Sequence, residues 1–479
     1  MRKKNSLKKI ILNSLKKIDY IKSITFVGSF LNSKNFSDID IVIIIDYLNS
    51  NKFKEIINSL KKVNHKKIYP KKKLIINSSF GPLKFDYKKN LVLHAMIYDE
   101  ASHKEHALSS PFTCYDWQRY RSSYGYNLKD KYPVLGFGVN DFIGNYRGIE
   151  NYLKSFKNRS ISYKEYQIKN KKIQLIQKKY PLKSKEQLIE FSYHIINNLT
   201  NNTLKFLNFE NIRFNKNYLQ KFHNEIFPKK NIEEFNFYFK KILKYKKNFN
   251  INIEIKEIDF NTKEYLKNLK NYLKKIKDLN FQITFMRHFK TKIESNIFLG
   301  QKLNPKIIKK KRKINNNYDL VFSSKMGRAI ESAKFYKNIV KKNSLLNEIN
   351  YGKAEGLNIQ QFSKKYPKII FSWKKRNDAK FPNGENLLDV EKRVKRFINY
   401  VDSKKYENRK ILAVSHNVFC RCLIGFFYNI KKYNIYKIYI PYGTKLEFIK
   451  FNDKLVPNIK NKKLKKIIFR NIYENSYSD

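Results

Sequence analysis

The chain has 479 residues, of which 42% are hydrophobic, and this excludes both a single-core domain and a disordered polymer and predicts two to four domains. Lys and Arg number 101 against 40 Asp and Glu, which gives a formal net charge of +61. Three cysteines without a repeated spacing, Cys114, Cys420 and Cys422, argue against a disulfide framework and for a reducing compartment.

The positive charge has two interpretations. It could hold a polyanion such as RNA, DNA or an anionic membrane surface. However, the excess is mostly Lys, is spread along the whole chain and accompanies abundant Asn, Ile, Phe and Tyr, as an AT-rich genome would give. A dedicated nucleic-acid surface would concentrate its charge and favour Arg. The compositional interpretation is therefore favoured over a nucleic-acid partner. Under both interpretations the positive charge of the protein would attract phosphorylated small substrates.

The first hundred residues predict a small α/β unit. Apolar periodicity predicts helices over 5–18 and 53–63, and strands over 23–27, 39–46, 74–80 and 91–98. Lys16 and Lys17 interrupt the first apolar run, which favours an amphipathic helix over a signal peptide. No apolar run is long enough to span a membrane, so a cytoplasmic location is expected.

The rest of the chain first becomes helical and then returns to alternating strands and helices. Helical apolar stripes cover 141–156, 183–207 and 232–245, and a further helix over 262–276 is polar and Lys-rich and leads into the next domain. From residue 281 the pattern predicts strands over 283–286, 320–322 and 410–414, and helices over 327–340, 388–401 and 418–428. Strands that alternate with helices favour a largely parallel sheet.

Two histidines follow two of these later strands. His288 ends the run Phe285-Met286-Arg287-His288, and His416 ends Leu412-Ala413-Val414-Ser415-His416. Catalytic groups in open α/β sheets lie beyond the carboxyl ends of the strands, so the two imidazoles could meet at one edge. With Arg287, Arg328 and Glu348 they supply the groups that phosphoryl transfer needs: cations for the phosphate, a nucleophilic imidazole and a proton donor.

These motifs resemble the histidine phosphatase family, which includes the cofactor-dependent phosphoglycerate mutases. The stretch Arg287–Thr291 is similar to the opening motif Arg-His-Gly-x-Thr, and Ser324–Ala333 is similar to the second block. The resemblance implies a three-layer α/β/α domain that needs no cofactor. The implied roles are a nucleophile at His288, a general acid at Glu348, a phosphate pocket of Arg287, Arg328 and His416, and substrate contacts from Thr291 and Asn417. Phe289 replaces the usual Gly and would narrow the pocket.

Each histidine taken alone is more simply a core residue with satisfied hydrogen bonds. The two arginines and Glu348 in register with them favour a phosphatase site instead. Whether the domain would act as a mutase or as a phosphatase stays open.

A second motif lies near the N-terminus, where Gly28-Ser29 ends a strand and Asp38-Ile39-Asp40 begins another. A Gly-Ser turn lets backbone N–H groups approach a phosphate, and strand alternation puts both carboxylates on one face, as a Mg²⁺ site requires. The motif resembles the polymerase-β-type nucleotidyltransferase superfamily. That resemblance implies a small mixed sheet, a nucleoside triphosphate substrate bound at Gly28 and Ser29, and Mg²⁺ held by Asp38, Asp40 and a third carboxylate.

The third carboxylate is the weak part of this second motif. The strand that should carry it offers His94, and Asp86 is the nearest substitute. Either Asp86 completes the metal site, or the domain binds a nucleotide with weakened catalysis. The simpler alternative is a plain turn and an ordinary edge strand, although two Asp residues inside an Ile/Val run are costly unless they are paired or hydrated.

Other polar and aromatic features favour structural interpretations. His103 and His106 have a spacing that suits a metal on a helix, but no further ligand pair is evident, so a solvated polar stretch is favoured. The aromatic stretch 117–126 is interleaved with Arg119 and Arg121 and favours a loop packed on the domain, with a smaller chance of lining an acceptor site. By analogy with multidomain transferases, the helices over 141–245 could cover a nucleotide cleft.

The sequence as a whole predicts a multidomain α/β protein. The expected parts are a nucleotidyltransferase-like domain at 1–110, a mainly helical domain at 111–250, a linker helix at 251–280, a histidine phosphatase domain at 281–455 and a basic tail at 456–479. The favoured function is a bifunctional enzyme that acts on a phosphorylated metabolite, in sugar or polyol nucleotide synthesis. The alternative is an RNA-directed transferase, or a nucleotide sensor, fused to a phosphatase.

Overall fold

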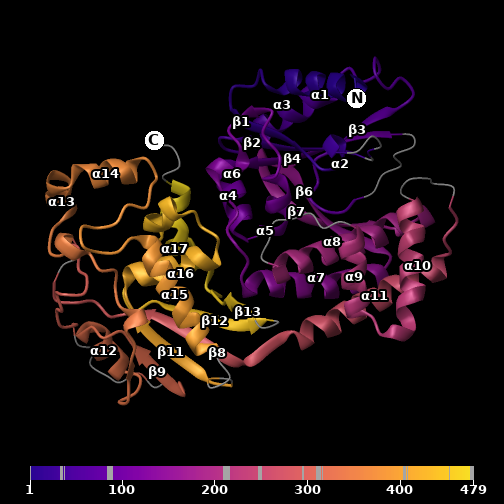
Figure 1. Cartoon of the computed structure of the whole chain (residues 1–479). Helices are drawn as coiled ribbons and strands as arrows, with labels where there is room; N and C mark the ends of the chain where they lie inside the picture. Colours follow the sequence, from indigo (N-terminus) through magenta and orange to yellow (C-terminus); the bar gives the residue numbers. More distant parts are fainter. Residues whose placement is uncertain are drawn as a thin grey trace. The chain divides into compact units, whose positions relative to one another are not determined.

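The computed structural model describes residues 2–32, 36, 38–83, 90–109, 111–208, 216–245, 251–293, 296–308, 314, 317–402, 406, 408–451 and 454–474. The chain forms two compact units, one of Met1–Val134 with Asp141–Lys275 and one of Leu135–Asn140 with Ile276–Asp479 (Figure 1). The predicted metal ligand Asp86 lies outside the described residues. Within the described part of the chain, no helix has the length and apolar character needed to cross a membrane.

The first unit is built on a mixed sheet with the strand order β3-β4-β2-β1-β5. The strands are β1 Ile21–Val27, β2 Asp38–Ile45, β3 Lys73–Asn77, β4 Asn90–Asp99 and β5 Tyr124–Gly125. β2 and β3 run parallel to β4, whereas β1 runs antiparallel to β2 and β5 antiparallel to β1.

One face of this sheet is the core of the unit. Every second residue of β2, from Ile39 to Ile45, packs with apolar residues of α1 (Arg2–Leu15) and α3 (Ser50–Lys61). Because side chains alternate along a strand, the intervening residues Asp38 and Asp40 of β2 and His94 of β4 lie on the opposite face.

Helices make up much of the remainder of the first unit. They are α2 Ser29–Asn32, α4 Glu100–Ser109, α5 Pro111–Trp117, α6 Leu128–Lys131, α7 Val139–Lys157, α8 Lys185–Asn208, α9 Lys216–Ile226, α10 Lys229–Tyr245 and α11 Ile255–Lys275. The sequence treated residues 251–280 as a linker helix, but α11 packs along α8 and buries Ile258, Tyr265 and Leu269. These apolar positions recur at helical spacing, so the helix has a buried face despite its many lysines.

A hairpin of β6 (Ser160–Lys169) and β7 (Lys172–Pro181) was not predicted from the sequence. Its turn residues, Asn170 and Lys171, have φ values of 50° and 62°, the positive angles that a two-residue hairpin turn needs. Most of its side chains are polar and at least partly exposed, so the hydrophobic alternation that signals a strand is weak here.

The second unit has a six-stranded sheet with the order β10-β9-β11-β8-β12-β13. The strands are β8 Lys277–Arg287, β9 Leu320–Ser323, β10 Lys341–Lys342, β11 Lys410–Ser415, β12 Lys445–Phe451 and β13 Lys454–Pro457. The first four in spatial order are parallel, as predicted, and β12 and β13 add an antiparallel edge that the sequence did not predict.

Successive residues of β8 show that this sheet lies between two helical layers. The ring of Phe285 contacts Phe397 of α15 (Leu387–Val401) and Phe419 of α16 (Asn417–Phe427). Met286, the next residue, belongs to a cluster with two alanines of α12 (Gly327–Lys334). Adjacent strand residues point to opposite faces, so α12 covers one face of the sheet and α15 with α16 the other.

Three more helices complete the second unit: α13 Ile359–Lys365, α14 Pro367–Lys374 and α17 Lys462–Glu474. The sequence treated residues 456–479 as a basic tail. Instead, α17 buries Ile468 and Phe469, and the Phe469 ring lies 5.0 Å from that of Tyr428. The lysines of this segment occupy one helical face and its apolar residues another, which is why its composition alone resembled a tail.

Candidate functional site

The two predicted histidines meet at the carboxyl end of the parallel strands β8 and β11. Arg287 pairs in register with Ser415, so the next residue of each strand is a histidine. The backbone N–H of His288 donates to the Ser415 carbonyl at 2.9 Å, and the ring centroids of His288 and His416 are 5.0 Å apart. Both side chains are buried.

The environment of His288 fixes its tautomer and its charge. Its Nδ1 lies 2.7 Å from the Phe289 carbonyl oxygen, which can only accept, so Nδ1 carries the proton and Nε2 keeps a lone pair. Burial lowers the pKa of His288 to about 3, the charges of Arg328 and Arg287 act in the same direction, and the Phe289 carbonyl opposes them. The imidazole is therefore neutral near pH 7, as a nucleophile must be.

His416 is held neutral in the same way. Burial lowers its pKa well below the usual range, and the nearby charges of Arg328, His288 and Arg287 lower it further. Its Nε2 lies 2.6 Å from the Ser324 hydroxyl. Its Nδ1 has no hydrogen-bond partner among the described residues, although it is buried. A buried nitrogen without a partner is uncommon in folded proteins and leaves one polar atom for a ligand.

Two guanidinium groups lie beside the histidines and are held by backbone carbonyls. Arg287 donates to Ile440 at 2.6 Å and stacks on the Tyr442 ring at 3.6 Å, a contact that the sequence did not predict. Arg328, which is 1% exposed, donates to the carbonyls of Leu303 and Gly300 at 2.9 and 2.7 Å. The Nε atoms of both arginines are buried without a partner among the described residues, so each can still donate to an anion.

The carboxylate of Glu348 lies at the start of the helix that follows His416. It accepts a hydrogen bond from the backbone N–H of Val418 in the first turn of α16, at 3.1 Å, and one from Ile349 at 3.0 Å. Its side chain is buried. Because His416 directly precedes this helix, the carboxylate and the histidine are neighbours although they are far apart in sequence.

A bidentate ion pair ties the segment that carries Glu348 to α15. Arg393 Nε and Nη2 lie 2.8 and 2.9 Å from the two carboxylate oxygens of Glu385. Arg393 Nη1 donates to the carbonyls of Leu345 and Asn347, at 2.9 Å each. No role was predicted for either charged residue from the sequence. Their geometry makes them positioning residues for the candidate acid.

Three other residues of the predicted motifs have local structural roles. The Thr291 hydroxyl donates to the Ile293 carbonyl at 3.2 Å, and Asn417 is the first residue of α16. Phe289 was expected to narrow the pocket, but its ring is buried in the cluster beneath α12, 5.6 Å from the Phe335 ring. Its apolar side chain has a partner cluster there, so the expected narrowing is wrong.

The model of the histidine phosphatase superfamily (branch 1) matches residues 310–455, which include Arg328, Glu348 and His416. The 2,3-bisphosphoglycerate-dependent phosphoglycerate mutase of Buchnera aphidicola is 30% identical over 158 residues, which cover 26% of this chain and 68% of that protein. The chain belongs to the histidine phosphatase superfamily.

Two further relatives match shorter shares of their own length. Phosphoserine phosphatase 1 of Hydrogenobacter thermophilus is 31% identical over 110 residues, covering 22% of this chain and 52% of that protein. A probable 6-phosphofructo-2-kinase of Schizosaccharomyces pombe is 35% identical over 131 residues, covering 26% of this chain and 22% of that protein. The chain thus spans about half of the first of these relatives and less than a quarter of the second.

We expect the Arg393 pair to matter for the histidine phosphatase domain through position rather than contact with substrate. Arg393→Ala should cost roughly 2–3 kcal/mol of stability, because it removes the cation paired with the Glu385 carboxylate and the donor to two backbone carbonyls. It should lower kcat roughly 10–100-fold with little change in KM, because the acid loses its position.

Thermal unfolding and steady-state kinetics on an aryl phosphate would check both effects of Arg393→Ala. Arg396→Ala, at an exposed position of the same helix, is the matched control and should change neither quantity. Arg393→Lys should recover stability more than kcat, since Lys supplies the positive charge but cannot make the two parallel hydrogen bonds of the guanidinium group. Equal kinetics for Arg393→Ala and Arg396→Ala would contradict the positioning role.

The neutral histidines of this domain also predict how stability depends on pH. The folded pKa of His288 is about 3 and its ordinary value is 6.5, so between these values the unfolded chain binds the extra proton. The free energy of unfolding therefore keeps the full contribution of neutral His288 above pH 6.5 and loses it progressively as the pH falls towards 3. His288→Asn should reduce the slope of unfolding free energy against pH by up to about 1.4 kcal/mol per pH unit. Urea unfolding of both proteins at several pH values between 5 and 7.5 would measure this difference. Identical slopes for the wild type and His288→Asn would contradict the prediction.

The second predicted motif lies on the wall of a large cavity inside the first unit. Gly28, Asp38 and Asp40 all line this cavity, whose volume is about 1000 Å³, whereas Ser29 begins α2 outside the lining. Gly28 has a φ of 76°, and a Cβ atom there would lie 2.7 Å from Asp40 Oδ2. Glycine is therefore needed at this turn, because a larger residue would displace the carboxylate.

His94 occupies the strand on which the third carboxylate of the predicted metal site was expected. It pairs in register with Asp40, its Nδ1 lies 2.8 Å from Asp40 Oδ1, and its Nε2 lies 2.8 Å from the Ser79 carbonyl oxygen. Burial lowers the pKa of His94, but the hydrogen bond and charge of Asp40, the Ser79 carbonyl and the charge of Asp38 together raise it overall. The imidazole thus competes for one of the Asp40 oxygens that a cation would use.

The other walls of the cavity come from helices of the same unit. α8 supplies a row of polar and aromatic side chains: Tyr193, His194, Asn197, Asn198, Asn201 and Asn202. Lys205, only 2% exposed, lines it too, with Nζ 2.8 Å from Asp116 Oδ2. Trp117, Arg119 and Tyr120 also line the cavity, so part of the aromatic stretch borders it as well as packing on the domain.

Proposed function

We propose that the histidine phosphatase domain removes or transfers the phosphoryl group of a small phosphorylated metabolite through a phosphohistidine at His288. The observation that carries this proposal is the convergence of two neutral imidazoles with two buried guanidiniums at the carboxyl ends of β8 and β11. The arrangement offers a nucleophile with a free lone pair and cationic donors for the phosphate oxygens.

The proposed reaction has two steps. Nε2 of His288 attacks phosphorus, the bond from phosphorus to the ester oxygen breaks, and that oxygen leaves with a proton that Glu348 supplies. Water, deprotonated by the same carboxylate, then attacks the phosphohistidine and restores the imidazole. A second hydroxyl compound in place of water would give a mutase, so the nature of the acceptor decides between the two activities. Arg287, Arg328 and His416 stabilise the charge that spreads over the phosphoryl oxygens in both steps.

A screen of metabolite phosphates, with and without each nucleoside triphosphate and Mg²⁺, tests this proposal. We expect hydrolysis of at least one sugar or polyol phosphate by the full chain. Release of phosphate should be independent of Mg²⁺, because the proposed groups need no metal. Folded protein that hydrolyses neither these substrates nor a generic aryl phosphate would contradict the proposal.

We propose a second function for the first unit, the binding of a nucleoside triphosphate with Mg²⁺. The supporting observation is the cavity, which holds both carboxylates of the Gly-Ser and Asp-x-Asp motif. Asp38 and Asp40 offer the oxygen donors that Mg²⁺ prefers, and the ion would neutralise triphosphate oxygens there. Gly28 would let the backbone approach a phosphate, and the amides of α8 would contact the sugar or the base.

The His94–Asp40 pair bears on the two alternatives left by the missing third carboxylate. With His94 bound to one Asp40 oxygen, cation affinity and transfer activity are both reduced. This favours a domain that binds nucleotide with weakened catalysis. Two sites on one chain then suggest consecutive steps on one sugar or polyol phosphate, or control of the phosphatase by a bound nucleotide.

A further inference from the structure

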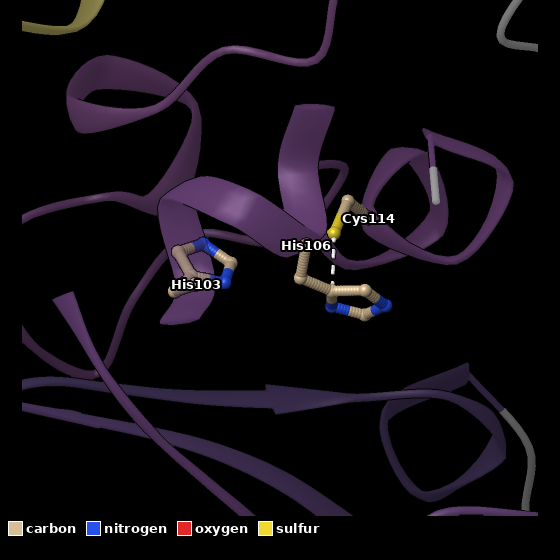
Figure 2. A group of neighbouring side chains, drawn as sticks. All are labelled: His103, His106 and Cys114. Carbon is tan, nitrogen blue, oxygen red and sulfur yellow. Dashed lines mark hydrogen bonds between the residues drawn. The ribbon is translucent and has the colours of Figure 1, made fainter. Parts of the chain in front are cut away.

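A separate group of side chains in the first unit has the chemistry of a metal site. His103 and His106 lie one turn apart on α4, and Cys114 lies on α5. One ligand atom from each of the three lies within 4.8 Å of the other two. Figure 2 shows the His106 ring and the Cys114 sulfur facing each other, with His103 beside them. The solvated stretch predicted from the sequence is wrong here, because His103 and Cys114 are fully buried.

His103 has an unusual environment for a polar side chain. It is fully buried, and neither of its ring nitrogens has a hydrogen-bond partner among the described residues. Its neighbours are the rings of Trp117 and Tyr132, with ring centroids 6.4 and 6.0 Å from its own. Folded proteins rarely leave buried polar atoms without partners, and a bound ion is one of the usual reasons for such an atom.

The spacing of the other two ligands already matches a bound ion. His106 Nδ1 and Cys114 Sγ are 3.4 Å apart. In a tetrahedral zinc site, with bonds of about 2.0 Å to nitrogen and 2.3 Å to sulfur, ligand atoms lie roughly 3.3–3.6 Å from one another. A change of side-chain rotamer that brings His103 closer by about 1 Å would complete three corners of that tetrahedron.

The protonation states of the three residues suit a soft divalent cation. Burial lowers the pKa of His103 to about 3, with His106 adding to the effect, and burial lowers that of His106 to about 4. Both imidazoles therefore keep a lone pair at neutral pH. Burial raises the pKa of the Cys114 thiol above its usual range, so a metal would have to displace its proton.

We propose that His103, His106 and Cys114 bind one zinc-class divalent ion, with a fourth position open to water or to a molecule in the cavity. His106 also lines the cavity, so the ion would lie at its wall. Three protein ligands with one open position are typical of zinc sites that contact a substrate. On binding, the metal–sulfur bond forms, the S–H bond breaks and one proton leaves to solvent.

This site differs in chemistry from the one proposed for Mg²⁺. Two nitrogens and a sulfur select zinc or cobalt, whereas the carboxylates of Asp38 and Asp40 select a hard cation. An excess of Mg²⁺ in a titration therefore keeps the carboxylates from contributing to the signal.

The test uses the full chain after removal of metal with a chelator, with Co²⁺ as the probe and Mg²⁺ in excess. We expect one Co²⁺ per chain, a sulfur-to-cobalt charge-transfer band, one proton released and displacement by Zn²⁺. Cys114→Ser should abolish the band and weaken binding at least about 100-fold. Cys420→Ser, which changes another buried cysteine, should leave both unchanged.

A second measurement needs no variant and covers the case in which Cys114→Ser fails to fold. In the wild-type chain, Zn²⁺ should slow alkylation of Cys114 at least about tenfold and leave Cys420 and Cys422 unaffected, as peptide mapping would show. Absence of stoichiometric binding by the folded wild type, binding without the charge-transfer band, or equal alkylation rates with and without Zn²⁺ would overturn the proposal. In that case His103, His106 and Cys114 are core residues that pack against the neighbouring aromatic rings and bind no metal.

Discussion

Replacement of His288 by alanine should abolish hydrolysis of a generic aryl phosphate, with kcat lowered at least about 10⁴-fold. The physical reason is that the neutral Nε2 of His288 is the proposed attacking atom, and no other imidazole than that of His416 lies beside it among the described residues. His416 cannot readily replace it, because its Nε2 is already bonded to Ser324. Circular dichroism and thermal unfolding should show that the variant still folds.

Two further measurements separate loss of the nucleophile from damage to the site. Acid-labile label from a ³²P-phosphorylated substrate should appear on the wild-type protein and be absent from His288→Ala. His65→Gln, which changes a buried histidine of the first unit that hydrogen-bonds only backbone carbonyls, is the matched control and should retain full turnover. Unchanged turnover in His288→Ala would remove this residue from the mechanism.

The double change Asp38→Asn/Asp40→Asn should remove Mg²⁺-dependent binding of nucleoside triphosphates. Both carboxylates line the cavity, and amides cannot supply the negative charge that holds a divalent cation beside a triphosphate. We expect affinity to fall at least about 100-fold, which corresponds to roughly 3 kcal/mol of binding free energy. Calorimetric titration with and without Mg²⁺ measures this loss.

The control for the double change should alter charge elsewhere on the same domain. Asp19→Asn removes a carboxylate at an exposed position before β1 and should leave the affinity unchanged. His94→Asn should raise the affinity for Mg²⁺, because it frees the Asp40 oxygen that the imidazole now occupies. Triphosphate binding that survives Asp38→Asn/Asp40→Asn with its Mg²⁺ dependence intact would end the case for this metal site.

The two proposed functions are supported by different observations. For the second unit, family membership and the convergence of the phosphate-binding groups agree. In the first unit, residues of a short motif line one cavity, and the pairing of Asp40 with His94 limits what that motif can catalyse. The experiments on His288 and on Asp38 with Asp40 are therefore independent, and either result can stand without the other.

The amino-acid sequence by itself predicted most of the secondary structure of both units. The apolar run of β2 and the helical stripes of α8 and α15 are local signals, because a strand buried on both faces is a continuous apolar run and burial of one helix face imposes a period. The motif spacings also placed His288 and His416 directly after two parallel strands, as the structure has them. The hairpin of β6 and β7 and the packing of α17 were missed, since their many polar side chains hide that period.

Only the tertiary structure decided which side chains face one another. The pairing of His94 with Asp40, the tether from Arg393 to the segment of Glu348, and the approach of Cys114 to His106 join residues between 8 and 54 positions apart. No local pattern encodes such a contact, because it depends on strand register and on how helices pack. Burial and the charges of neighbouring groups then shift the pKa of His288 down and that of His94 up, and both influences are properties of the folded chain rather than of any residue in it.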